Sequence, residues 1–375
     1  MRAMDTLTHA LLGAATGQVA FGRRLGWRAT VIGVVAAELP DLDFFIHSAA
    51  DPLLNIELHR HFTHSFVFSP VIALLATLPW LFRAAFREQR LALLLCGLAA
   101  CWSHILLDAC TSYGTQFLVP FSQQRFGWDF ISIIDPVFTG ILLAGLVAGW
   151  VANRQSGGET ATPASRRGVW VALGLGAAYM ALGAVQKTRA HAAQAELARA
   201  RGHRVERSEA MPTMGNHLVW RSLYLHDGRI HSDRLRVPWL GAVMVREGAS
   251  LPLVSQRDLS PEEAARNGSL RSFERFAWFS DGWIARAPGD PAVIGDMRYS
   301  LSARAFDPIW GIRFTAPGAP TEVVWVNRSR ERKISPGELW AEITGAHLDY
   351  RPLPALTRRG PELTSPPAPP TNPGL

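Results

Sequence analysis

The sequence contains little cysteine. Only three cysteines occur in 375 residues, and Cys96, Cys101 and Cys110 all fall in one apolar stretch. Their spacing is not that of a zinc ribbon, and buried helical cysteines are usually small core residues. A metal site built on cysteine is therefore not expected.

A dense block of positive charge is also lacking. The net charge of +7 comes from 38 Lys and Arg against 31 Asp and Glu. Many of the basic residues flank apolar segments, where membrane proteins use them to set orientation, so we expect no nucleic acid partner. A clean signal-peptide core is missing too, because Asp5 and His9 interrupt the first apolar stretch. We expect that segment to be retained.

Long uncharged runs are present, but they are confined to the first half. The chain is apolar up to about residue 185, and it is polar and rich in arginine beyond Lys187. This division predicts a helical membrane module of about six segments, followed by a smaller β-rich or α+β soluble domain. We expect a transmembrane domain over residues 1–186, a helical stalk over 187–209, a β-rich domain over 210–355, and a disordered proline-rich tail over 356–375.

Four apolar runs approach the ~20 residues that a helix needs to cross the hydrocarbon core. They are residues 65–82, 91–110, 137–152 and 169–185. Two shorter runs, 7–21 and 27–39, are expected either to span as a tight pair or to sit partly embedded.

Arginines between the runs predict the orientation of the module. They lie in the first, third and fifth loops, as Arg23, Arg24 and Arg28, then Arg83, Arg87 and Arg90, then Arg154, Arg166 and Arg167. With six crossings these loops share one side, which the positive-inside rule makes the cytoplasm. The C-terminal domain is then extracytoplasmic.

Histidine and aspartate gather in four short clusters at the ends of the apolar runs, within residues 8–9, 38–43, 59–65 and 104–108. Ionisable groups beside membrane spans are costly and mark function by default. Imidazole and carboxylate together are the ligand set of a divalent metal such as zinc. His104 and Asp108 lie four residues apart, a spacing that places both on one face of a helix. The clusters therefore suggest a metal site.

The predicted orientation puts every candidate ligand at the outer membrane face. Each cluster alone has an ordinary explanation, since a His-x-x-x-Asp pair is more often a structural hydrogen bond and a histidine-rich loop is often a surface loop. Scattered core histidines, however, would have no reason to share one face. The metal ligands expected are His9, Asp41, His64, His104 and Asp108.

The ordered motifs resemble a known bacterial family. Thr-His near the start, Pro-Asp-Leu-Asp, His-Arg-x-x-Thr-His-Ser and His-x-x-x-Asp, in this order, resemble the membrane-bound predicted metal-dependent hydrolases of the LexA-regulated inner-membrane type. The match covers roughly residues 4–140. The resemblance implies a multi-pass protein of the bacterial inner membrane and a hydrolase, but it names no substrate.

The same order is more distantly similar to the core of zinc-dependent phospholipase C and single-strand nucleases. That similarity implies zinc ligation by the five residues named above. No histidine follows Asp108 until His191, so the further ligands of a three-zinc cluster are not evident. One or two ions, with Zn²⁺ as the expected metal, fit this sequence.

The expected chemistry is hydrolysis of an ester or phosphoester. A site embedded in the membrane suggests a lipid or lipid-linked substrate. Asp41 is a candidate ligand or general base, and Asp43 is the other candidate base. His59 and His61 are expected to support ligands or to touch substrate. Arg60 either clamps a phosphate or faces lipid headgroups.

Two other acids lie at the ends of apolar runs and are not expected to be metal ligands. Glu38 either orients a ligand histidine or caps its helix. Asp135, which precedes Pro136, is expected to be a helix N-cap.

Two alternatives to a hydrolase stay open. One is a transporter or proton relay that uses His and Asp for ion movement, although such sites usually lie near the bilayer midplane. The other is a membrane anchor for the outer domain with a purely structural metal. In that domain, residues 217–225, 276–282 and 321–326 are expected to form strands, with turns after the first two.

Overall fold

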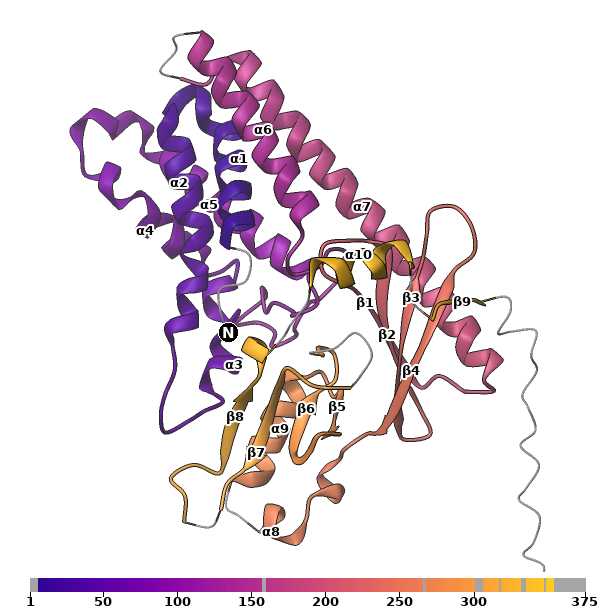
Figure 1. Cartoon of the computed structure of the whole chain (residues 1–375). Helices are drawn as coiled ribbons and strands as arrows, with labels where there is room; N and C mark the ends of the chain where they lie inside the picture. The colour runs from indigo at the N-terminus through magenta and orange to yellow at the C-terminus, as the bar shows by residue number, and fades with distance from the viewer. Residues whose placement is uncertain are drawn as a thin grey trace, which may run out of the picture.

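The computed structural model describes residues 6–156, 160–265, 268–300, 306–316, 318–331, 335–346 and 349–353. The proline-rich tail expected over 356–375 lies outside these ranges. The described chain has an N-terminal helical part and a C-terminal part with two antiparallel sheets (Figure 1).

All six apolar runs form helices. The main helices are α1 (Thr6–Leu25), α2 (Trp27–Glu38), α4 (Ser69–Leu81), α5 (Arg90–Ala109), α6 (Pro136–Gln155) and α7 (Pro163–Ala200). Short elements between them are η1 (Pro40–Phe45), α3 (Leu54–Leu58), η2 (Phe62–His64) and η3 (Ala84–Gln89). The last apolar run and the predicted stalk are one continuous helix, because alanine and charged residues extend α7 to Ala200.

Helices α1 and α2 form a close pair inside the bundle. Gly13 and Gly33 face each other, and a Cβ atom on either would collide with the carbonyl oxygen of the other. Small residues at such crossings let two helix backbones approach closely. The pair brings the start of α1 and the end of α2 to the same end of the bundle.

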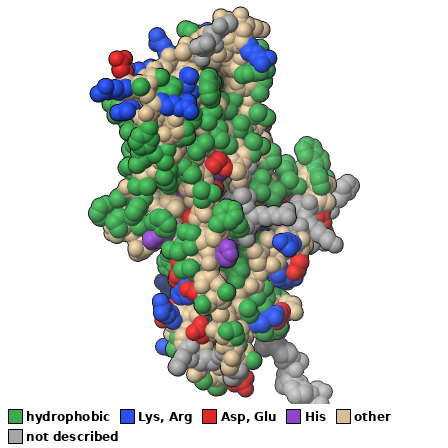
Figure 2. All heavy atoms as spheres, turned by 90° about the vertical axis from the view of Figure 1, so that its left-hand side faces the viewer, with side chains coloured by type: hydrophobic (Ala, Val, Ile, Leu, Met, Phe, Trp, Pro, Cys, Tyr) green, Lys and Arg blue, Asp and Glu red, His purple; other side chains and the backbone are tan. Residues whose placement is uncertain are grey.

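Exposed apolar side chains form a belt over the helices. On the face seen in Figure 2, this belt lies between a group of basic residues at one end and the mixed surface of the sheets at the other. By length and composition, α5 with η3, α6 and α7 are candidate membrane spans. A fourth is the bent pair formed by residues 54–64 and 69–81. The structure thus supports three to four spans in the described residues and leaves the embedding of α1 and α2 open.

The C-terminal part contains two antiparallel sheets. The first has the order β1-β2-β3-β4-β9 and the second β5-β6-β7-β8. The strands are β1 (Arg207–Pro212), β2 (Val219–His226), β3 (Arg229–Arg236), β4 (Met244–Pro252), β5 (Ile284–Ala287), β6 (Asp290–Asp296), β7 (Trp310–Phe314), β8 (Val323–Asn327) and β9 (Arg351–Pro352). The short helices are η4 (Gln256–Asp258), α8 (Pro261–Ala264), α9 (Ser269–Phe279), η5 (Ser329–Glu331) and α10 (Pro336–Thr344).

One strand prediction was wrong. Residues 276–279 belong to helix α9, not to a strand. The aromatic run resembles a strand in isolation, but the buried side chains Phe273, Phe276 and Phe279 recur every three residues, which is helical spacing. The strands expected near 217–225 and 321–326 are present as β2 and β8.

The second sheet packs on the loops of the helical part. Leu53, Ile56 and Tyr113 share one hydrophobic core with Phe276 and Phe279 of α9. Arg275 of α9 also forms paired ion contacts with Asp51 and Glu57, at 2.8 and 2.5 Å. The sheet region therefore rests on the loop that follows α2.

A histidine group on the β2–β3 hairpin predicts a dependence of stability on pH. Burial lowers the pKa of His231 to about 4, with help from His203 and Arg201. The folded protein therefore binds fewer protons than the unfolded chain, and this contribution to stability is lost as the pH falls from about 6.5 towards 4. His231→Asn should flatten the fall in melting temperature over this range, whereas His47→Asn, a change in an exposed loop, should leave it as in the wild type.

Candidate metal centre

Four elements deliver the candidate ligands to one end of the helical bundle. His9 lies in the first turn of α1, and Asp41 lies in η1, which starts at Pro40 directly after α2. His64 ends η2, and His104 and Asp108 lie in the last turns of α5. Because α5 runs towards this end and α1 away from it, residues far apart in the sequence meet here.

Four side chains converge on one point. Nε2 of His64 lies 3.0 Å from Nε2 of His104, 3.2 Å from Oδ2 of Asp108 and 3.4 Å from Oδ1 of Asp41. Nε2 of His104 lies 3.5 Å from the same Asp108 oxygen and 3.8 Å from the same Asp41 oxygen. Each residue thus offers one atom to a common centre.

These distances fit a tetrahedral ion. Zinc binds histidine nitrogen and carboxylate oxygen at about 2.0–2.2 Å, so the ligand atoms of a regular tetrahedron stand about 3.3–3.6 Å apart. The five measured separations run from 3.0 to 3.8 Å. The donor set of two imidazoles and two carboxylates also suits a divalent metal.

Hydrogen bonding alone does not account for this cluster. Asp108 is fully buried. Its Oδ1 is paired with Arg60, but its Oδ2, which faces His64 and His104, has no hydrogen-bond partner among the described residues. Nδ1 of His104 is also buried without one. Buried polar atoms in native proteins nearly always have partners, and a cation between the four side chains would supply one for the carboxylate.

His9 stands beside the four-atom group rather than in it. Its Nε2 lies 3.1 Å from Oδ1 of Asp108, the oxygen that points away from His64. Its ring packs on that of His104, with centroids 4.0 Å apart. A cavity of about 20 Å³ borders His9, Arg60 and Asp108, and this is room for one water molecule. His9 therefore contacts the centre from the α1 side.

Asp43 orients the ligand His64. Its Oδ2 lies 3.2 Å from Nδ1 of His64 and accepts hydrogen bonds from the Thr63 hydroxyl at 2.6 Å and the Arg60 backbone N–H at 3.0 Å. Its Oδ1 lies 2.6 Å from Nδ1 of His59. A carboxylate behind a ligand histidine fixes the ring and its tautomer. Asp43 and His59 thus stand behind the ligands, although Asp41, Asp43 and His59 also form a second group of potential ligands.

Asp43→Asn should weaken metal binding 10–100-fold without unfolding the protein, because the amide cannot hold the His64 ring as the carboxylate does. Competition with a metal chelator measures the affinity. Asp227→Asn, in the exposed turn between β2 and β3, is the matched control. Equal affinities in wild type and D43N would rule out this positioning role.

Arg60 does not face lipid headgroups. It is 2% exposed, and its Nη2 lies 2.7 Å from Oδ1 of Asp108. Its Nη1 donates to the Asp108 carbonyl at 3.2 Å and to the Thr111 hydroxyl at 3.1 Å. The headgroup interpretation is wrong because the loop folds inward over the end of α5, where Arg60 balances the Asp108 carboxylate.

Other residues of the site region have structural surroundings. His61 lies 3.2 Å from the Gln123 side chain, outside both ligand groups. Asp135 caps α6 by accepting hydrogen bonds from the backbone N–H groups of Val137 and Phe138, as predicted. Glu38 is the last residue of α2.

Two residues at the centre were missed by sequence reasoning. Thr63 lies inside the histidine motif, and its contact with Asp43 depends on a 3-10 turn. Tyr113 packs edge-on against His59, 5.4 Å between ring centroids, and links the centre to Phe279 of α9. Neither role has a signal in residue spacing, because both depend on loop conformation.

Residues 4–190 match the YdjM inner membrane protein family. The inner membrane protein YbcI of Escherichia coli (strain K12) is 32% identical over 139 residues, which are 34% of this chain and 75% of YbcI. This chain belongs to the YdjM family of inner membrane proteins. The uncharacterized protein YfhP of Bacillus subtilis (strain 168) is 30% identical over 165 residues, 41% of this chain and 48% of YfhP.

The YdjM family match contains the whole centre. Every residue from His9 to Asp108 discussed above lies within it, whereas both sheets lie beyond it. No solved structure matches the chain. The likeness to zinc-dependent phospholipase C and nucleases therefore stays a hypothesis.

Proposed function

We propose that this YdjM family protein is a metal-dependent hydrolase that cleaves an ester or phosphoester at the membrane surface. The observation that supports it best is the convergence of Asp41, His64, His104 and Asp108 at tetrahedral ligand distances. The distant resemblance to zinc phosphodiesterases supports the choice of a phosphoester.

In a hydrolase, the protein would hold one ion through His64, His104 and Asp108, and Asp41 would stand at the fourth position. A bound zinc ion lowers the pKa of a coordinated water to about 7 and polarises a phosphoryl or carbonyl oxygen. A second ion, if one binds, would use the adjoining group of Asp41, Asp43 and His59.

Asp41 is the residue best placed to serve catalysis. Its side chain is 18% exposed, while those of His64, His104 and Asp108 are at most 1% exposed. Catalytic zinc sites keep three protein ligands and one position for water or substrate. We assign the water position to the side of the ion next to Asp41. There the Asp41 carboxylate would accept the proton of the attacking water.

The centre would face the outside of the cell. The basic residues of the first, third and fifth loops lie at the other end of the helices, above the apolar belt (Figure 2). The positive-inside rule then makes that end cytoplasmic. A site at the opposite membrane face, beside exposed apolar helices, suits a lipid or lipid-linked substrate. The sheets would lie on the same outer side.

A structural metal is the second candidate, and one observation favours it. Four protein ligands form a closed set, which is typical of structural zinc, and the second sheet packs directly on the loop that carries two of them. In this case the ion would fix the loop under the sheets and take no part in chemistry.

One experiment separates the two candidates. The full chain, purified in detergent, is stripped with a chelator and reloaded with Zn²⁺, and both its melting temperature and its hydrolysis of a phosphodiester, a phosphomonoester and a phospholipid are measured. A hydrolase should lose activity against at least one substrate on stripping and regain it on reloading. Asp41→Asn should retain the ion better than His64→Ala and still lose activity.

A metal that stabilises the chain while no substrate is cleaved would support the structural candidate and contradict the hydrolase. Activity that is unaffected by stripping would contradict both. His47→Ala, a histidine change in an exposed loop, is the control for every measurement.

A further inference from the structure

The loop between β3 and β4 carries an exposed, uncharged tip. Residues 237–245, Val-Pro-Trp-Leu-Gly-Ala-Val-Met-Val, contain no charged side chain, although they lie in the polar half of the chain. Trp239 is 45% exposed and Leu240 is 91% exposed, and the two residues that follow are exposed as well. Apolar side chains scattered singly are ordinary on a surface, whereas a contiguous group is typical of a protein or membrane contact. We call residues 239–242 the hairpin tip.

Helix α7 holds the base of the hairpin tip. Gln186 donates a hydrogen bond to the Val237 carbonyl at 2.7 Å, and Arg189 donates one to the Pro238 carbonyl at 2.8 Å. The Arg189 guanidinium also lies 5.8 Å from the centre of the Trp239 ring, which is within the range of a cation–π contact. These contacts fix the hairpin tip at one level of α7.

That level is where the apolar part of α7 ends. The last apolar run of this candidate membrane span stops at residue 185, and its side chains Leu182 and Val185 are 47% and 51% exposed. Arg189 lies four residues further on, which is about 6 Å along the helix axis. Because Leu182, Val185 and Arg189 follow one another at spacings of three and four residues, they share one face of the helix. The exposed apolar face of α7 thus leads directly to the hairpin tip.

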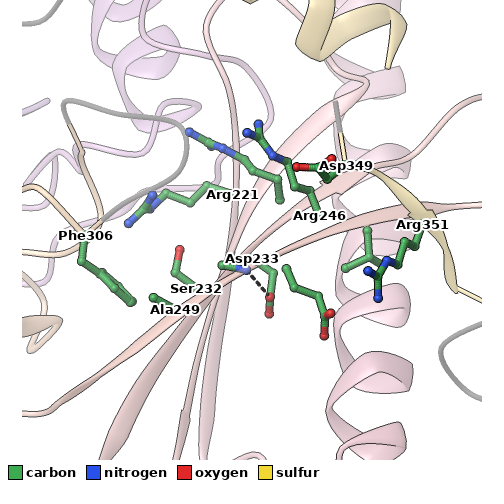
Figure 3. A pocket seen from close by; sticks show the side chains of 12 residues that line it. Arg221, Ser232, Asp233, Arg246, Ala249, Phe306, Asp349 and Arg351 are labelled. Atoms are coloured by element: carbon green, nitrogen blue, oxygen red, sulfur yellow. Dashed lines mark hydrogen bonds between the residues drawn. The ribbon is translucent and has the colours of Figure 1, made fainter. Parts of the chain in front are cut away.

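The strands behind the hairpin tip are also held against α7. Arg201 of α7 binds Asp233 of β3 at 2.7 Å and Glu247 of β4 at 3.1 Å. Asp233 accepts a hydrogen bond from the Gly248 backbone N–H at 3.1 Å, which ties the two strands together (Figure 3). In Figure 1 the loop between β3 and β4 rises to the level of the helical bundle, while the opposite ends of these strands point away from it. The sheet therefore presents the tip to the membrane end of α7.

We propose that the hairpin tip inserts into the interface of the lipid bilayer, in the leaflet at the metal-centre end of the helices. Tryptophan is enriched at this depth because its ring is apolar and its N–H is polar. An arginine such as Arg189 can lay its stem on apolar surface and keep its charge among the headgroups. Because the tip adjoins the exposed apolar face of a membrane span, the bilayer around α7 is the partner that this position favours. The tip would then hold the first sheet at the membrane surface.

Quenching by labelled lipid tests this placement in the full chain. Ala242→Cys leaves Trp239 and Leu240 in place, and its thiol is labelled with the fluorophore NBD. The native cysteines are buried, and the unmodified chain supplies the labelling background. The protein is reconstituted in phosphatidylcholine nanodiscs whose lipids carry a nitroxide either near the headgroup or near the end of the acyl chain. We expect a loss of NBD emission that is larger with the shallow nitroxide than with the deep one.

Matched variants locate the effect. Arg229→Cys lies at the exposed opposite end of β3, a strand of eight residues and so about 26 Å long, and it should be quenched by neither lipid. Leu240→Asp added to A242C should lower the quenching to the level of R229C. Leu270→Asp, the same change at an exposed position of α9, should leave it unchanged.

Quenching of A242C no greater than that of R229C would overturn the proposal, whether the tip then lies in water or is covered by a second copy of the chain. Metal content plays no part in this readout, so its failure is separable from failure of the hydrolase.

Discussion

Replacing His104 with alanine is expected to remove bound metal from the purified protein almost completely. His104 and Asp108 come from the same helix, and together they supply two of the four atoms that converge on the centre. Mutating a residue that orients a metal ligand already lowers metal affinity about 10–100-fold. Loss of a ligand itself should therefore lower metal affinity more than about 100-fold. Metal content is measured by elemental analysis after gel filtration, and affinity by competition with a chelator.

The matched control is His47→Ala, which removes an exposed histidine and should keep the wild-type metal content. Asp108→Asn should behave as H104A does, because both residues face the same point. Stoichiometric metal in H104A and D108N would show that the ion, if present, sits elsewhere.

Replacing Gly13 with alanine should destabilise the helical part by about 3 kcal/mol, at the upper end of the cost of overpacking. The added Cβ would collide with the Gly33 carbonyl oxygen and lie 2.6 Å from Cβ of Ala37. Backbone cannot move aside as a flexible side chain can, so α1 and α2 must separate. The end of α2 carries η1 and Asp41, and metal affinity should therefore fall together with the melting temperature in detergent.

Two further variants test the origin of this effect. Gly174→Ala, in α7 with no heavy atom near the added Cβ, should be neutral or stabilising, because alanine favours helix by up to about 1 kcal/mol. The double change of Gly13 and Gly33 should cost less than the sum of the two, since the first already moves the helices apart. Additive costs, or a G13A protein as stable as the wild type, would argue against close packing of this pair.

Much of the helical part could be predicted from local sequence. Long uncharged runs give helices whatever their partners, and the His104–Asp108 spacing implies a shared face in any helix. The ordered motifs then predict Asp41 and His64 as further ligands. Three to four helices qualify as spans by length and composition. Whether α1 and α2 also enter the membrane is left open, because α2 has only 12 residues.

What was not predictable depends on contacts between distant segments. The burial of Arg60 requires its loop to fold over α5, and nothing in the His-Arg motif distinguishes that from an exposed arginine. The aromatic run at 276–279 was misassigned because a four-residue window cannot separate a strand from a helix end. The alignment of Arg221, Arg234 and Arg246 across three strands follows from strand register, which the separate sequences of β2, β3 and β4 do not reveal.

X-ray absorption at the zinc edge of the reloaded, full-length protein tests the central claim most directly, because it reports the ligand atoms themselves. The structure predicts four nitrogen or oxygen neighbours at about 2.0–2.2 Å, with the outer-shell signature of two imidazoles. A sulfur neighbour, or a spectrum without imidazole, would contradict a centre built by Asp41, His64, His104 and Asp108.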